Sequence, residues 1–155
     1  MKKIDLGQTL QILGNIAILV GILLLVYELS LNRQMMRAQT RHQIAQSIID
    51  IQTADAANAQ LMDVLVRAEN GEELTMSEVW QYQARTNALF RYWENVHYQF
   101  RQGLYDQAEF SSQKATWERV LTNFSHMRRY WCAFRSDYSA DFAAELDSLV
   151  KNDAC

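Results

Sequence analysis

Hydrophobic side chains dominate one continuous stretch near the start of the chain. Residues 10–27 contain only two strongly polar side chains, Gln11 and Asn15, and Glu28 follows them. A helix of this length extends about 27 Å, which matches the hydrocarbon thickness of a bilayer. The pattern predicts a transmembrane helix with a short N-terminal tail over residues 1–31.

A cleaved signal peptide is the competing interpretation, because Lys2 and Lys3 precede the apolar residues. The residues that follow, YELSLNRQMM, lack the small-x-small pattern of a cleavage site. We therefore expect an uncleaved anchor.

Beyond the span, apolar side chains recur at helical spacing. Residues 33–69 contain no glycine or proline, and isoleucines occupy positions 44, 48 and 51. We expect the membrane helix to continue as a stalk helix over residues 32–70.

Two local motifs predict further helices in the remaining bundle, residues 71–155. Gly71 is a stop signal, and Thr75-x-x-Glu78 is a capping box that starts a helix ending near Gly103. Asp106-x-x-Glu109 starts the next helix. This helix leads into Phe110, Trp117, Leu121 and Phe124.

A last helix is expected over residues 139–151, with Phe142, Leu146 and Leu149 inward. The chain has no proline and five glycines, so helix-breaking residues are scarce. Aromatic residues concentrate between residues 80 and 142, which supplies a core. The sequence predicts an all-α protein: a transmembrane helix, a stalk helix and a small helical bundle.

One face of the transmembrane helix carries small residues. Gly7, Gly14 and Gly21 are seven residues apart and fall on one line in a left-handed supercoil, with Asn15 beside them. Small residues allow close backbone approach in lipid, and an amide there gains from an interhelical hydrogen bond. We expect this face to be an oligomer contact, most simply between copies of the chain.

Glu28 continues the same line, and two interpretations of it stay open. An acid at the edge of a span can reach water. In an oligomer it would instead form a ring of carboxylates that acts on cations.

Charge sets the expected orientation and partners. The formal net charge of −3 argues against nucleic acid, which requires a basic surface. Arg33, Arg37 and Arg41 follow the span and slightly outnumber Lys2 and Lys3 before it, which predicts a cytoplasmic C-terminal domain. The three arginines share one helical stripe, which suits lipid headgroups or an ordinary solvated face.

Chemical motifs are sparse. Cys132 and Cys155 form no metal-binding pattern, and we expect both to be reduced. Glu94-x-x-His97 has the spacing found in di-iron bundles, but no second copy exists, so an ion pair of Glu94 with Arg91 or Arg101 is the alternative.

The stretch HMRRYW, residues 126–131, places Arg128 and Arg129 beside two aromatic residues. It suggests either an anion-binding corner or pairing with acids of neighbouring helices. No nucleophile motif, phosphate loop, cofactor motif or HExxH is present in the sequence.

Three stretches resemble uncharacterised bacterial single-span inner-membrane proteins with an aromatic-rich helical cytoplasmic domain: LGNIAILVGILLLVYELSLNRQMMRAQ, YWENVHYQFRQGLYDQAEF and RRYWCAFRSDYSADFAAELDSLV. The resemblance implies a membrane anchor and a cytoplasmic domain, and it implies no activity. Residues matching the central motif are Glu94, Asn95, Tyr98, Gln99, Gly103 and Asp106, for which we expect a structural role in a polar network closing the turn after Gly103. The family pattern often has proline at Ala140 and an aromatic or aliphatic residue at His97.

These observations favour a non-enzymatic, membrane-anchored protein that self-associates and acts as a scaffold or accessory subunit of a larger membrane complex. A small homo-oligomeric channel or transport accessory using Asn15 and Glu28 is one alternative. A metal-dependent helical enzyme using Glu94 and His97 is another.

Overall fold

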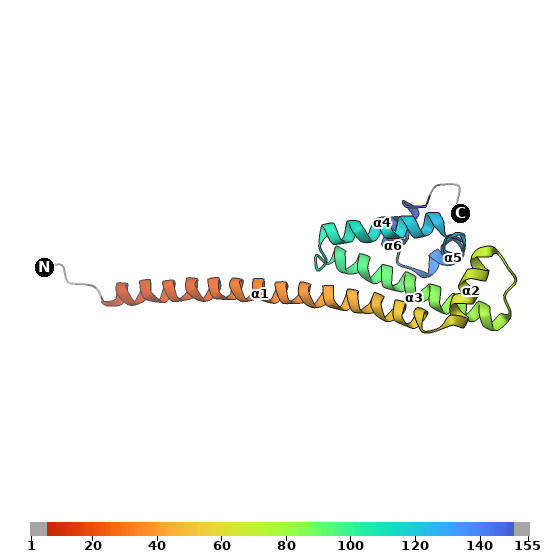
Figure 1. Cartoon of the computed structure of the whole chain (residues 1–155). Coiled ribbons are helices and arrows are strands. Elements are labelled where there is room, and N and C mark those ends of the chain that lie inside the picture. Colours follow the sequence, from red (N-terminus) through yellow and green to blue (C-terminus); the bar gives the residue numbers. More distant parts are fainter. Residues whose placement is uncertain (1–5, 151–155) are drawn as a thin grey trace. The chain divides into compact units, whose positions relative to one another are not determined.

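The structure is a computed structural model that describes residues 6–150 (Figure 1). Within that range the chain forms helices and no strand, which confirms the all-α prediction. The elements are α1 (Leu6–Ala56), α2 (Ala59–Asn70), α3 (Met76–Arg101), α4 (Gln107–Asn123), α5 (Ser125–Phe134), the short 3-10 helix η1 (Arg135–Asp137) and α6 (Ala140–Asp147).

The chain divides into two compact units, residues 1–39 and 40–155, and α1 contributes to both. Of the described helices, α1 is the one long and apolar enough to cross a membrane, with a mean hydropathy of 2.4 over its most apolar window. None of that window is buried within the protein. The expected apolar helix, with a small helical bundle after it, is therefore present.

The continuous stalk expected over residues 32–70 is interrupted. α1 ends at Ala56, and Asn58 starts α2 by accepting a hydrogen bond from the Leu61 backbone N–H at 3.0 Å. The Asn58 N–H itself bonds the Asp55 carbonyl, so the chain turns without glycine or proline. An asparagine side chain can replace a helical backbone hydrogen bond in this way, so the first helix ends at Ala56 and not near residue 70.

The local cap predictions are confirmed. Thr75 and Glu78 form both bonds of a capping box at the start of α3. Asp106 accepts hydrogen bonds from the backbone N–H groups of Ala108 and Glu109 at the start of α4. Gly71 ends α2 with φ +73°, a left-handed conformation that favours glycine.

The core of residues 40–155 is aromatic, as expected. Trp93 and Trp117 stack with centroids 5.6 Å apart, and Phe142 packs edge-on against Trp117. Helices α3, α4, α5 and α6 each supply large buried side chains, of which Phe90, Trp117, Trp131, Phe142 and Leu146 are completely enclosed. Phe124, the last apolar residue that the sequence assigned to the helix after Asp106, is 45% exposed, because α4 ends there and α5 begins at Ser125.

Cys132 is disulfide-bonded, which differs from the expectation of reduced thiols. Disulfides are typical of oxidising compartments. This bond therefore bears on which side of a membrane the bundle lies. Cys155 lies outside the described residues.

Candidate functional site

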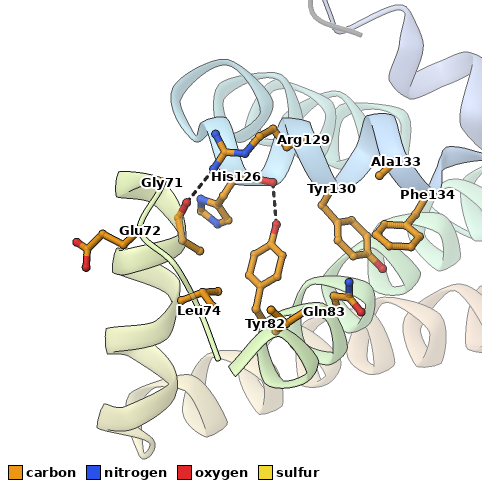
Figure 2. Close-up of a pocket in the computed structure, with 12 residues that line it drawn as sticks. Gly71, Glu72, Leu74, Tyr82, Gln83, His126, Arg129, Tyr130, Ala133 and Phe134 are labelled. Carbon is orange, nitrogen blue, oxygen red and sulfur yellow. Dashed lines mark hydrogen bonds between the residues drawn. The ribbon is translucent and has the colours of Figure 1, made fainter. Parts of the chain in front are cut away.

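A cavity of about 410 Å³, largely open to solvent, lies at the surface of the bundle, where the end of α2, the following loop, the start of α3 and one face of α5 meet (Figure 2). Its lining combines aromatic and aliphatic side chains with a few polar groups. The residues that line it are Ala68, Gly71, Glu72, Leu74, Val79, Tyr82, Gln83, His126, Arg129, Tyr130, Ala133 and Phe134.

Arg67 holds the loop that forms one wall of this cavity. Its guanidinium donates to the Glu78 carboxylate at 2.6 Å and to the Glu73 backbone carbonyl at 2.8 Å, and lies 3.5 Å from Glu72. Backbone hydrogen bonding from Thr75, together with Arg67, lowers the pKa of Glu78 to about 2. The loop is therefore tied to the helices on both sides of it.

Aromatic rings from α3 and α5 form another side of this cavity. Tyr82 of α3 meets Tyr130 of α5 edge-on at 6.3 Å, and Tyr130 lies 4.7 Å from Phe134 one turn later. The Tyr82 hydroxyl donates to the His126 carbonyl at 2.8 Å, as Figure 2 shows. Burial raises the pKa of Tyr82 to about 12, so its hydroxyl stays a neutral donor.

Glu69 and His126 form a polar pair beside the cavity. The Glu69 carboxylate accepts the backbone N–H groups of Ser125 and His126 at 3.1 and 3.0 Å and lies 2.5 Å from His126 Nδ1. Desolvation opposes ionisation of Glu69, but these bonds outweigh it and lower its pKa to about 2.

A second, more apolar cavity of about 390 Å³ adjoins this pair. His126 lines both cavities, whereas Glu69 lines only the second. Methionine and aliphatic side chains dominate the second lining, which includes Met62, Leu65 and Met127. His126 thus borders two cavities of different polarity.

The two arginines of HMRRYW bond neutral oxygens. Arg129 donates to the Ala68 carbonyl and the Ser125 hydroxyl, both at 2.8 Å. Arg128 donates to the carbonyls of Leu121 and Thr122 near the end of α4. Cations at these helix ends complement the helix dipoles. Neither arginine forms an ion pair with an acid in the described chain, which differs from the acid-pairing interpretation.

The Glu69–His126 pair resembles the arrangement that orients an imidazole for acid–base chemistry. Here, however, Glu69 also caps the first turn of α5, and His126 is only 7% exposed. These features suit a structural pair better than a base that must reach a substrate. The adjoining cavity can bind a small molecule, since it is concave, largely apolar and edged by polar groups.

Glu94 and His97 have separate surroundings. Glu94 pairs with Arg91 at 2.7 Å, as one alternative predicted, and also accepts the Ser139 backbone N–H at 2.8 Å. His97 packs between Phe110 and Phe142, and burial lowers its pKa. Within residues 6–150 no group of three or more histidine, cysteine or acidic side chains is arranged to hold a metal ion.

The other residues of the central motif occupy different places. Gly103 takes φ +69° in the turn after α3, and Asp106 caps α4 directly after it. Gln99 donates to Asn95 at 3.3 Å along α3, and Tyr98 is largely exposed. The turn thus uses Gly103 and Asp106, while Glu94 contacts the start of α6.

The residues singled out on α1 are mostly exposed. Gly7, Gly14, Asn15 and Glu28 face outward, and a Cβ added at Gly14 or Gly21 would meet no atom within 4 Å.

The basic stripe of Arg33, Arg37 and Arg41 is also exposed. Arg41, expected among lipid headgroups, pairs with Glu109 of α4 at 2.5 Å.

Sequence reasoning missed Glu69, Tyr82 and His126 as neighbours. Glu69 opens the stretch ENGEEL, which indicates only a turn, and its partners lie 56 and 57 residues away. The one available signal was HMRRYW, which marked the α5 side of the cavity.

Comparison of the chain with protein-family models, with curated proteins and with solved structures gave no match.

Proposed function

We propose that this chain is a non-enzymatic, membrane-anchored helical protein that self-associates through α1 and serves as a scaffold or accessory subunit. The observation that carries the proposal is the exposure of the apolar side chains of α1. Between residues 10 and 29 the large hydrophobic side chains are 49–68% exposed. Apolar surface is stabilised by about 25 cal/mol per Å² when it leaves water, so lipid or other chains cover this segment.

Self-association is supported by the line of small residues. Open space around Gly14 and Gly21 leaves room for the backbone of a second helix, and Asn15 adds an amide beside that line. Helices in lipid associate through such close packing and through interhelical hydrogen bonds. The bundle of residues 40–155 would then be presented in several copies to a partner.

The glycine face is tested by cross-linking in native membranes. Gly14→Ile and Gly21→Ile should each lower the yield of cross-linked homo-oligomer, because the added side chains hold the backbones apart. Leu19→Ala is the matched control, since Leu19 lies roughly opposite both glycines on the helix. Equal yields from both glycine variants and from the control would remove the glycine face as the contact.

We further propose the bacterial inner membrane, with residues 40–155 in the cytoplasm. The excess of Arg33, Arg37 and Arg41 after the span supports this orientation. The disulfide of Cys132 supports the opposite one. Labelling of cells with a membrane-impermeant maleimide decides between the two orientations. A cytoplasmic Cys132 should be a protected thiol that reacts with the maleimide only after lysis. A Cys132 that is disulfide-bonded in untreated cells would place the bundle outside the cytoplasm.

A further inference from the structure

The cavity of Figure 2 has the composition of a small-molecule site. Its volume of about 410 Å³ falls within the range of ligand pockets, roughly 300–1,000 Å³. Tyr82, Tyr130 and Phe134 give it one aromatic side, and Leu74 of the tethered loop closes another. Rings in such a frame favour a planar apolar group, because offset and edge-on contacts are available to it.

Arg129 brings a positive charge to the edge of this cavity. Glu69 accepts the backbone N–H groups of Ser125 and His126, and Glu72 lies 3.5 Å from Arg67, so both acids already have partners within the bundle. In the described chain, Arg129 bonds only the neutral oxygens of Ala68 and Ser125. A guanidinium has five N–H donors, and these bonds use two of them.

We propose that the cavity binds a small aromatic carboxylate, with its ring among Tyr82, Tyr130 and Phe134 and its carboxylate on Arg129. The guanidinium is a planar fork that matches a carboxylate and hydrogen-bonds it more strongly than it does a neutral oxygen. The Ala68 and Ser125 bonds hold that fork at the edge of the cavity, so little ordering is required when the ligand binds. This site does not depend on how α1 associates.

The chain provides its own control for the role of Arg129. Arg128 is the preceding residue and also donates to neutral oxygens, but it faces the end of α4 and does not line the cavity. Replacing either arginine by glutamine removes one positive charge from the same turn of α5. A nonspecific effect of charge would change both variants, whereas direct contact would change only Arg129→Gln.

The test uses the full chain in lipid nanodiscs and 4-fluorobenzoate, observed by ¹⁹F NMR. The wild-type protein should bind the probe saturably. Arg129→Gln should weaken the affinity about tenfold, the usual size of one lost charge-assisted hydrogen bond, and Arg128→Gln should leave it unchanged. The uncharged 4-fluorobenzyl alcohol should bind the wild type more weakly than 4-fluorobenzoate and should not distinguish the variants.

A second variant tests the cavity itself. Ala133 lines the cavity from α5, so Ala133→Trp should fill it and abolish binding while the helical circular dichroism stays the same. The proposal is overturned if the wild type shows no saturable binding at millimolar probe. It is also overturned if Arg129→Gln and Arg128→Gln bind equally, or if Ala133→Trp binds as the wild type does.

Discussion

The carboxylate of Glu69, near the end of α2, caps the first turn of α5 by accepting the backbone N–H of His126 while also contacting its ring. The residue at the N-cap position of α5, Phe124, makes no side-chain capping bond. α6 is similar, because its N-cap Ser139 makes no such bond and Glu94 of α3 accepts the Ser139 N–H instead. Two short helices are thus capped by carboxylates from other helices, which couples their formation to tertiary packing.

Removing the Glu69 charge should destabilise the bundle. We expect Glu69→Gln to lower the free energy of unfolding by about 1 kcal/mol, the usual value of an N-cap, since an amide oxygen replaces the carboxylate. The measurement is chemical unfolding of the full chain in detergent, followed by tryptophan fluorescence. All four tryptophans lie between residues 80 and 131, so the signal reports the bundle alone. Glu118→Gln, at an exposed position of α4, is the control and should change little.

Acid should destabilise the bundle through the same carboxylates. The pKa of Glu69 is lowered to about 2 from its ordinary 4.5, so its contribution is present above 4.5 and is lost as pH falls through about 2. The pKa of Glu78 is lowered to about 2 as well, so Glu78 contributes to the loss of stability over the same pH range. The denaturant concentration at the unfolding midpoint of the wild type should therefore decrease as the pH is lowered from 4.5 to 2. The decrease should be less steep in Glu69→Gln. Parallel curves for the two proteins would contradict the capping role.

The ion pair between Arg85 and Asp55 should contribute more than an exposed pair. Nε of Arg85 lies 3.1 and 3.0 Å from the two carboxylate oxygens of Asp55, and the side chains are 19% and 13% exposed. A double-mutant cycle with Arg85→Met and Asp55→Asn should give a coupling energy of about 1–2 kcal/mol. The Arg101–Asp141 pair is 50% and 62% exposed, and the same cycle there should give about 0.3 kcal/mol. Equal coupling energies for the two pairs would show that burial does not strengthen the Arg85–Asp55 pair.

His97 should add a second pH dependence of stability, in the same direction as the carboxylates but at higher pH. Burial lowers the pKa of His97 in the folded state, so the unfolded chain binds a proton more readily as pH falls below about 6.5. Stability is lost over that window. His97→Phe keeps the contacts with Phe110 and Phe142 and should remove this part of the pH dependence. Thermal unfolding at pH 8 and pH 5 would show this effect. The unfolding temperature of His97→Phe, measured relative to the wild type, should rise at pH 5 only.

Local signals predicted the helix starts because their donors and acceptors lie within one turn. Thr75 with Glu78, and Asp106 with Ala108, are separated by three residues or fewer, so the sequence alone contains the interaction. The break at Asn58 was missed because the flanking alanines favour one continuous helix, and a single asparagine lowers helix propensity only modestly.

The cavity depends on contacts that span the bundle. Tyr82 and His126 are 44 residues apart, and Arg129 bonds Ala68 across 61 residues. Neither pairing leaves a periodic or local pattern in the sequence. Helical periodicity places Tyr82 and Tyr130 on inward faces, but which inward side chains meet is decided by how the helices pack.

Native mass spectrometry of the intact chain, extracted from membranes in mild detergent with bound species retained, tests the proposed membrane-anchored, self-associating protein most directly. We expect a homo-oligomeric mass for the wild type and a shift toward monomer for Gly14→Ile and Gly21→Ile, with Leu19→Ala unchanged. A monomeric wild-type mass in gently extracted membranes, or recovery of the chain from the soluble fraction, would contradict it.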